Sequence, residues 1–308
     1  MLFRSVRCSP EQIIITSGAQ QALDLIGRFL VATGDQVWME DPGYSGALRA
    51  LRATSARIVP VPVDEDGLIV KTGRKLAPKA KLAYVTPANQ FPMSVTMSAD
   101  RRLQLLRWAA SANAWVIEDE YDAEYRYVGH PVASLQTLDT SGCVIYVGTF
   151  TKMLFNALRL GFMVLPERLV EAFAAARSFV DRHPPTLDQA ILAEFITEGH
   201  FGHHVRRMRQ AYAERIEVLK TAADKQLAGV LDVMHVGAGI RTLGWLKTWK
   251  SDYDAAQQAE KFGLEVQPLS MFTTKYKQPP ALMLGFASCN PAELRRGVSV
   301  LATALRAR

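Results

Sequence analysis

The sequence predicts an α/β protein, with a mainly parallel seven-stranded sheet covered by helices on both faces and a small α+β domain at the C-terminus. The first observation behind this prediction is that short apolar runs alternate with amphipathic stretches, as in parallel sheets whose strands are joined by covering helices. The second is that long helical segments replace this alternation after Pro166. We therefore expect a large domain over residues 1–185 and a small domain over residues 186–308.

Each expected strand is an apolar or β-branched run bounded by turn or helix signals. The seven runs are 11–16, 36–39, 57–61, 82–86, 115–117, 144–147 and 161–165. An amphipathic helix over 19–32 follows the first run. Ser98 is suited to cap the helix before the fifth run, and we expect Leu103, Leu106 and Ala110 to form the buried face of that helix.

The C-terminal part reads as helices with a few strands between them. Asn290 and Pro291 are typical of a helix start, with the asparagine as cap and the proline in the first turn. The expected helices are 167–182, 187–197, 201–226 and 291–305, and the expected strands are 241–246 and 282–287.

Composition limits the classes of function. The chain has 308 residues, is 49% hydrophobic and carries a net charge of +6, with its basic residues spread along its length. This distribution suits an anionic ligand and predicts no specific nucleic-acid surface. Cys8, Cys143 and Cys289 form no CxxC pair, and no apolar run is long enough to span a membrane. We expect a cytoplasmic protein with no membrane segment.

Lys152 is the residue around which the functional prediction is built. It follows the run 144–147 in a turn rich in hydroxyl groups, with Arg159 seven residues later. Ligands of open α/β sheets bind at such strand ends. A lysine next to another cation has its ammonium form disfavoured, and a neutral amine attacks a carbonyl to form a Schiff base. The stretch predicts a lysine that binds an aldehyde cofactor, and it also fits an ordinary basic surface turn.

Four other stretches place polar or aromatic groups after predicted strands. Ser17-Gly18-Ala19-Gln20 opens a helix, whose free amides suit a phosphate or simply an ordinary capped turn. The acids 118–122 suit a protonated ring nitrogen, a magnesium or calcium ion, or a solvated loop. Tyr44 can stack on a flat ring or cover the core edge. Asn89 can donate to a ring oxygen or belong to a plain loop.

These stretches gain weight together because the carboxyl ends of parallel strands meet at one edge of a sheet. A phosphate cradle, an aromatic ring, an amide, an acid, a lysine and an arginine are the groups that pyridoxal 5'-phosphate requires. We predict no metal site: His200 and His204 lie at helical spacing, but no acid follows in the HExxH manner. We expect that helix start to be solvated or to face another subunit.

Five ordered motifs resemble the aminotransferase-like domain of MocR-type regulators of the GntR family, which are related to fold-type I aminotransferases. They are SGAQQALDL, EDPGY, VTPANQFP, VIEDEYDAEYRY and VGTFTKMLFNALRLGF, and the resemblance runs from about Cys8 to the C-terminus. It implies a pyridoxal-phosphate-dependent domain that transaminates or senses a small amino compound. It also implies a homodimer.

The resemblance assigns roles to eleven residues. Lys152 would form the Schiff base, Asp119 would pair with the pyridine nitrogen, and Tyr121 would neighbour the ring hydroxyl together with Asn89. Tyr44 would stack on the ring. The phosphate would be held by Gly18, Ala19, Gln20, Thr149, Thr151 and Arg159. An incoming amine would displace Lys152, which would then move a proton between substrate and cofactor.

Two departures from the family pattern bear on the ligand. The strand 282–286 lacks the arginine that commonly binds a substrate carboxylate, and Gly46 stands where a GABA-responsive member has a second arginine. The resemblance also predicts that this chain lacks the winged-helix domain and the first part of the aminotransferase fold. We therefore expect weak catalysis and low solubility beside an N-terminally extended chain. The alternative to an enzyme is a non-catalytic effector-sensing domain.

Overall fold

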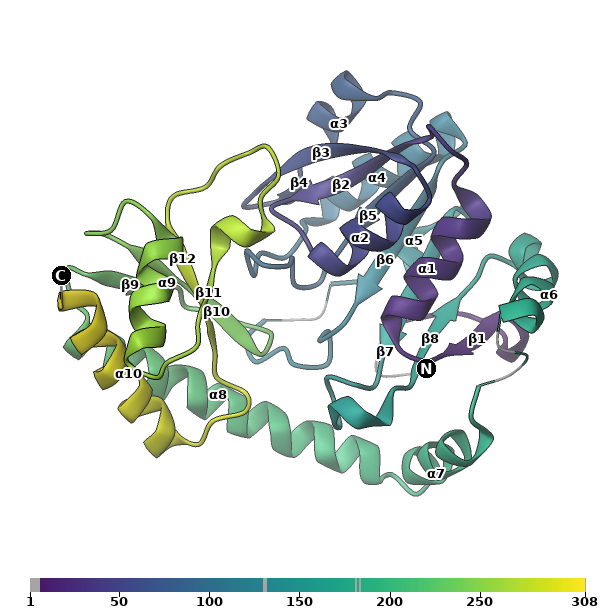
Figure 1. The fold of residues 1–308 in the computed structure, drawn as a ribbon. Coiled ribbons are helices and arrows are strands. Elements are labelled where there is room, and N and C mark those ends of the chain that lie inside the picture. The colour runs from purple at the N-terminus through teal and green to yellow at the C-terminus, as the bar shows by residue number, and fades with distance from the viewer. Residues whose placement is uncertain (1–5, 130–131, 181, 183, 308) are drawn as a thin grey trace.

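In the computed structural model, the described residues are 6–129, 132–180, 182 and 184–307, and they form a large and a small sheet. The large sheet has eight strands in the order β1-β8-β7-β6-β5-β2-β3-β4 (Figure 1). Their bounds are β1 (Ile13–Thr16), β2 (Gln36–Asp41), β3 (Arg57–Asp64), β4 (Gly67–Leu68), β5 (Leu82–Val85), β6 (Trp115–Glu120), β7 (Val144–Thr149) and β8 (Gly161–Val164).

The neighbouring strands β3, β2, β5, β6 and β7 run parallel to one another. β8 runs antiparallel to both β7 and β1. The prediction of a mainly parallel sheet is confirmed, and the predicted strands are all present. The sheet also contains β4, which folds back on β3 and is too short to leave a pattern in the sequence.

Helices cover both faces of the large sheet (Figure 1). They are α1 (Ala19–Leu30), α2 (Ser45–Ala53), α3 (Val70–Leu76), α4 (Ala99–Ala112), α5 (Leu135–Leu138) and α6 (Val170–Val180). On β2, Met39 packs in the cluster that includes α1 and α2, whereas Trp38 stacks on Trp108 of α4 with ring centroids 3.6 Å apart. Because both faces are covered, the strands read as continuous apolar runs.

The helix α4 buries only part of the predicted face, in which Leu106 is buried as expected. Ser98 caps it as expected. Leu103 and Ala110, however, are exposed, and Arg102 is fully buried instead. The Arg102 guanidinium donates to three backbone carbonyls and lies 3.6 Å from Glu118. A search for regularly spaced apolar residues cannot identify a buried arginine. The spacing therefore did not predict that Arg102, with its hydrogen bonds satisfied, lies in the core.

The C-terminal part forms an antiparallel sheet in the order β11-β12-β10-β9, with helices packed around it. Asn290 caps the last helix through the amides of Ala292 and Glu293, as its sequence predicts. The elements are α7 (Thr186–Thr197), α8 (His200–Gln226), β9 (Leu231–Val233), β10 (Arg241–Leu246), α9 (Asp252–Lys261), β11 (Gln267–Pro268), β12 (Ala281–Gly285) and α10 (Pro291–Arg306). β9, β11 and α9 are additions to the prediction.

The long helix α8 connects the two parts of the molecule (Figure 1). Near its start, Phe201 packs on Phe150 with ring centroids 5.8 Å apart, and farther along it packs against α10. One apolar cluster contains residues from both sides of position 185, so the domain boundary stays a prediction. None of the helices in the described part of the chain is long and apolar enough to cross a bilayer.

Asp41, at the end of β2, fixes a loop of the C-terminal part to the large sheet. Its carboxylate is fully buried and accepts hydrogen bonds from the amides of Thr274, Lys275 and Tyr276 at 2.8, 2.7 and 2.9 Å. A second link joins the Gly43 amide to the Phe272 carbonyl at 3.0 Å. Charge-assisted bonds of this kind are among the stronger ones in proteins.

We expect Asp41→Ala to lower the free energy of unfolding by about 2–4 kcal/mol, because the change removes a buried anion that satisfies three amides. Denaturant unfolding would measure the loss. Asp41→Asn keeps one acceptor and should lose less than Asp41→Ala. An Asp41→Ala chain as stable as the wild type would show that this loop is held by other contacts.

Glu40, which precedes Asp41, gives the fold a dependence on pH. Burial raises the pKa of its carboxyl to about 7, against the hydrogen bonds that it accepts from Thr86 and Gln90. A pKa that is higher in the folded than in the unfolded chain stabilises the folded form at low pH. This contribution is complete below the unfolded pKa and is lost as the pH rises through about 7.

We therefore expect Glu40→Gln, which mimics the protonated carboxyl, to reduce the fall in stability between roughly pH 5 and pH 8. The reduction should be on the order of 1–3 kcal/mol, from the size of the pKa change. Unfolding curves at several pH values would measure it, with the exposed Glu65→Gln as control. Parallel stability profiles for Glu40→Gln and the wild type would contradict this account.

Candidate active site

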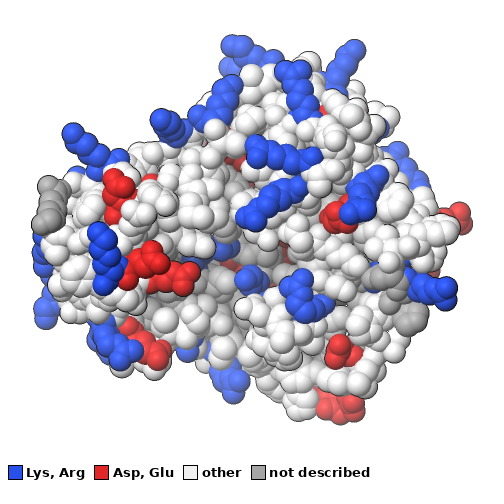
Figure 2. Space-filling view, in the orientation of Figure 1, with Lys and Arg blue, Asp and Glu red and all other residues white. Residues whose placement is uncertain are grey.

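A cavity of about 360 Å³ lies at the carboxyl ends of the central strands of the large sheet. This size falls in the usual range for small-molecule sites, roughly 300–1,000 Å³. The cavity is lined by Ala19, Gln20, Tyr44, Tyr84, Phe91, Asp119, Tyr121, Thr149, Thr151, Lys152, Asn156, Arg159 and Arg241. Figure 2 shows the surface hollowed between the two parts of the molecule, with Lys and Arg side chains gathered around the hollow.

Lys152 lies in the turn that follows β7. Burial lowers the pKa of its ammonium, and the cationic Arg241 and Arg159 lower it further, while Asp122 acts in the opposite direction. A larger share of Lys152 is therefore the neutral, nucleophilic amine at neutral pH than in an exposed lysine.

The backbone of the lysine turn is held from outside the large sheet. The carbonyl of Met153, the next residue, accepts a hydrogen bond from the Tyr125 hydroxyl at 3.2 Å. The His204 Nε2 atom lies 2.7 Å from the same carbonyl and reaches it from α8. His204 is thus engaged with the lysine turn, and no cluster of His, Cys, Asp and Glu that could hold a metal ion occurs in the described chain.

One corner of the cavity is suited to an anion. Arg159 donates to the Ser17 carbonyl at 3.0 Å, which places its guanidinium beside the start of α1. Gly18 has a φ of +89°, and a Cβ there would lie 3.2 Å from Nη2 of Arg159. The Oγ1 atom of Thr151 is buried and has no hydrogen-bond partner among the described residues. Helix amides, a guanidinium and an unsatisfied hydroxyl together form a phosphate site.

Asp119 provides the acid of the cavity. It lies at the end of β6, is 3% exposed, and accepts a hydrogen bond from the Tyr84 hydroxyl at 2.7 Å. Tyr84 comes from the adjacent strand β5, and burial followed by the charge of Asp119 raises the pKa of its phenol. The hydroxyl therefore stays protonated and donates to the carboxylate.

The other acids of this stretch point elsewhere. Glu118 accepts from the amides of Leu135 and Gln136, and burial raises its pKa to about 7 against the attraction of Arg102. Glu120 accepts from an amide of a neighbouring loop and does not line the cavity. Asp122 accepts from Asn89 and acts on Lys152 electrostatically, but it does not line the cavity either. Asp119 is thus the member of the acidic stretch that lines the cavity.

Aromatic rings form the outer wall of the cavity. Tyr44 packs edge-on against Phe91, with ring centroids 5.5 Å apart. Tyr121 donates from its hydroxyl to the Asn89 carbonyl at 2.8 Å. A Cβ on Gly46 would lie 2.5 Å from the Tyr44 hydroxyl, so Gly46 leaves the space that the tyrosine occupies.

The structure brings most of the predicted site residues to this cavity and leaves two outside its lining. Gly18 lies next to Arg159, just behind the anion corner. Asn89 is buried, and its Nδ2 donates to Asp122 at 2.9 Å. The roles assigned to individual site residues stay predictions.

Sequence reasoning missed Tyr84, Phe91, Asn156 and Arg241 as lining residues. Tyr84 reads as part of a buried strand, and Phe91 and Asn156 stand inside motifs that were considered for other residues. Arg241 begins β10 of the small sheet, with its guanidinium 4.2 Å from the ring centroid of Phe91 and 4.9 Å from that of Tyr121. No local signal marks it, because only the packing of the two parts brings it to Lys152.

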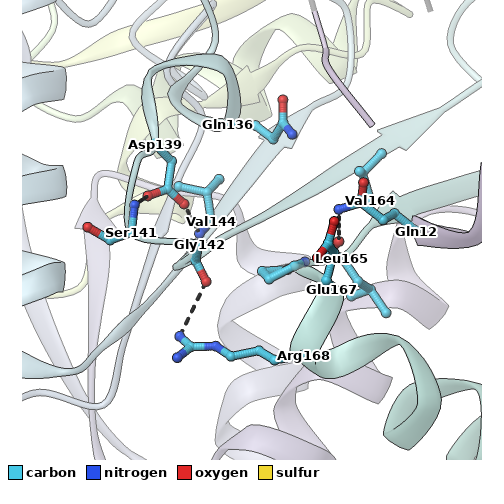
Figure 3. Close-up of a pocket in the computed structure, with 11 residues that line it drawn as sticks. Gln12, Gln136, Asp139, Ser141, Gly142, Val144, Val164, Leu165, Glu167 and Arg168 are labelled. Atoms are coloured by element: carbon cyan, nitrogen blue, oxygen red, sulfur yellow. Dashed lines mark hydrogen bonds between the residues drawn. The ribbon is translucent and has the colours of Figure 1, made fainter. Parts of the chain in front are cut away.

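Figure 3 shows the residues around a separate cavity of about 400 Å³, which lies where β7 begins. Lys152 follows the other end of β7. Its polar groups are engaged with nearby backbone: Asp139 accepts from the amides of Ser141 and Val144, and Arg168 donates to the Gly142 carbonyl. This arrangement is explained by the turn that Asp139 organises, and it does not point to a ligand.

Comparisons with known proteins agree with this description of the fold. The model of the aminotransferase class I and II family matches residues 2–301. A probable rhizopine catabolism regulatory protein, MocR, of Rhizobium meliloti is 40% identical over 306 residues, which cover 99% of this chain and 61% of the regulator. The chain spans 62–64% of the lengths of three further HTH-type regulators. The predicted resemblance to MocR-type regulators is confirmed.

Solved aminotransferases share the fold. An archaeal alanine:glyoxylate aminotransferase has a TM-score of 0.91 and 30% identity, with 98% of this chain and 76% of that one covered. The α-aminoadipate aminotransferase LysN of Thermus thermophilus, complexed with N-(5'-phosphopyridoxyl)-L-leucine, has a TM-score of 0.89 and 27% identity, with 96% and 77% covered. The cofactor expectation is thereby confirmed at the level of the family. The chain belongs to the aminotransferase class I and II family.

Proposed function

We propose that this chain binds pyridoxal 5'-phosphate covalently through Lys152 and exchanges that bond for one to a small amino compound. The observation that carries the proposal is that Lys152, with a lowered pKa, shares one cavity with Asp119 and with an anion corner. When bound, pyridoxal phosphate supplies an aldehyde that condenses with amines and a ring that accepts electrons.

The residues of the cavity fit this cofactor. The buried, unsatisfied Oγ1 of Thr151 and the guanidinium of Arg159 would hold the phosphate, with the first amides of α1 beside them. The ring of Tyr44 would cover one face of the pyridine. Thr149 orients the turn, since its Oγ1 accepts from the Thr151 amide at 3.1 Å.

Two residues would handle protons. Asp119, kept in place by the Tyr84 hydroxyl, would hold a proton on the ring nitrogen through a buried charge-assisted bond. Lys152, once freed by an incoming amine, would take a proton from the carbon next to the substrate nitrogen and deliver it to the cofactor. A lowered pKa favours the neutral amine that accepts this proton, and it makes the resulting ammonium a stronger acid for the delivery.

The second candidate function is effector sensing without turnover. It is favoured by the 40% identity to a regulatory protein of which this chain covers 61%. In this case amine exchange at Lys152 would change the conformation of the chain and so signal the presence of a ligand to another part of a regulator. No keto acid would be released. A homodimer and a cytoplasmic location belong to the same proposal.

An absorption scan of the purified chain with pyridoxal phosphate, followed by a panel of amino compounds, tests the proposal. We expect a visible band that indicates a lysine-linked cofactor and that changes when a suitable amine is added. Release of a keto acid would identify a transaminase, whereas a spectral change without keto acid would identify a sensor. A chain that never develops the band would overturn the proposed function.

A further inference from the structure

We propose that Arg241 binds the carboxylate of the amino compound, which makes the ligand an amino acid rather than a simple amine. The inference rests on the proposed function, because it concerns the same cavity. Arg241 lies on a different strand from the one, β12, that commonly carries the carboxylate-binding arginine in the family that the sequence resembles.

The strand β12 offers no cation to the site. Met283 of this strand is 9% exposed and packs in an apolar cluster with Phe91, Leu243 and Leu269. A carboxylate that entered this cluster would lose its hydration without gaining a partner. A cation that binds an acidic group here must therefore come from another segment that lines the cavity.

Arg241 occupies that position on the neighbouring strand. It pairs with Gly285 across the β10–β12 ladder and projects into the Lys152 cavity. It also lines an adjoining cavity of about 560 Å³, and the two cavities share Thr151, Lys152, Asn156 and Arg241. A ligand whose amine reaches Lys152 thus meets Arg241 in the same continuous space.

The surroundings of the guanidinium suit an anion that comes from outside. Phe91 and Tyr121 present their rings to it, which orients the planar group, and its Nε is buried without a hydrogen-bond partner in the described chain. No described acidic side chain lies within ion-pair distance of Arg241, and the acid that acts on it electrostatically, Asp122, already accepts a hydrogen bond from Asn89. Arg241 is half-buried and also hydrogen-bonds the Tyr121 side chain, but its buried Nε has no partner among the described residues. A guanidinium in such a position can bind a carboxylate in bidentate fashion.

Two other arginines near the cavity are less suited to this task. Arg159 donates to the Ser17 carbonyl at the anion corner, where the cofactor phosphate would hold it. Arg49 is exposed on α2, bonds to Ser45 of its own helix and does not line the cavity. Arg241 is therefore the cation that faces the substrate.

The test compares amino acids with the amines that remain when their carboxylate is removed: alanine with ethylamine, leucine with isoamylamine, and phenylalanine with phenethylamine. The concentration that half-completes the change in the cofactor band is measured for each pair. In the wild type we expect at least one amino acid to act at a concentration about 10- to 100-fold lower than its amine. This is the usual contribution of a hydrogen bond between charged groups.

Arg241→Gln should remove this difference by weakening the response to the amino acid, while the response to the amine persists and shows that the site is intact. Arg241→Lys keeps the charge but loses the bidentate geometry, so its preference for the amino acid should lie between those of the wild type and Arg241→Gln. Arg49→Gln, the matched control, should behave as the wild type. Equal responses to amino acid and amine in the wild type, or an unchanged difference in Arg241→Gln, would overturn the proposal.

A second measurement separates this proposal from the proposed function. If the wild type forms no cofactor band, the proposed function fails, and calorimetry of 3-phenylpropionate and isocaproate on the cofactor-free chain then decides the role of Arg241. Binding to the wild type that weakens in Arg241→Gln and persists in Arg49→Gln would support a carboxylate site. The absence of any difference between wild type and Arg241→Gln would refute it.

Discussion

Replacing Lys152 by alanine is expected to abolish the visible band of the lysine-linked cofactor completely. The cavity is otherwise preserved, because the turn is held through the Met153 carbonyl by Tyr125 and His204 and not through the Lys152 side chain. Pyridoxal phosphate should then bind reversibly through the anion corner alone. Any turnover should fall by about 10²–10⁴-fold from the loss of the proton-transferring amine.

Borohydride reduction followed by peptide mapping would measure this result directly. In the wild type the cofactor should be trapped on the peptide that contains Lys152, and in Lys152→Ala the label should vanish. Lys220→Ala, which changes a surface lysine paired with Asp224 on α8, is the matched control and should be labelled as the wild type is. A label of equal yield on another lysine in Lys152→Ala would exclude Lys152 as the attachment point.

The second large effect is expected for Asp119→Asn. The asparagine oxygen can still accept from the Tyr84 hydroxyl, so the local structure should survive, but the anion that would hold a proton on the ring nitrogen is lost. We expect the cofactor band to form and the rate of amine exchange or transamination to fall by about 10²–10³-fold. This is the usual cost of removing one preorganised electrostatic contact from a buried site.

Stopped-flow absorption with a responsive amine would give the rate. Glu120→Gln is the matched control, since it neutralises a buried acid one residue away on the same strand that does not line the cavity. It should change the rate by no more than a few-fold. An Asp119→Asn chain that reacts as fast as the wild type would show that the acid does not act on the cofactor ring.

Much of the large sheet could be predicted from the sequence, because strands buried on both faces must be apolar throughout and their helices must carry one apolar face. The same logic located the site: polar groups that follow such strands reach the same sheet edge, which is why Lys152, Asp119 and Tyr44 were found together. The spacing of apolar residues gave a wrong prediction in α4, where Leu103 is exposed and Arg102 is buried.

Tertiary structure alone decided which groups complete the site. Tyr84 reaches Asp119 because β5 and β6 are neighbours, and strand order is set by packing of the whole sheet rather than by local sequence. Arg241 reaches Lys152 because the small sheet docks on the large one, partly through the amides that Asp41 binds. The sequence by itself determined the longer strands, their order along the chain and the residues at their ends, but not the short strands β4, β9 and β11. The contacts between distant segments depend on how their surfaces pack against each other, and this packing cannot be predicted from the residues of either segment alone.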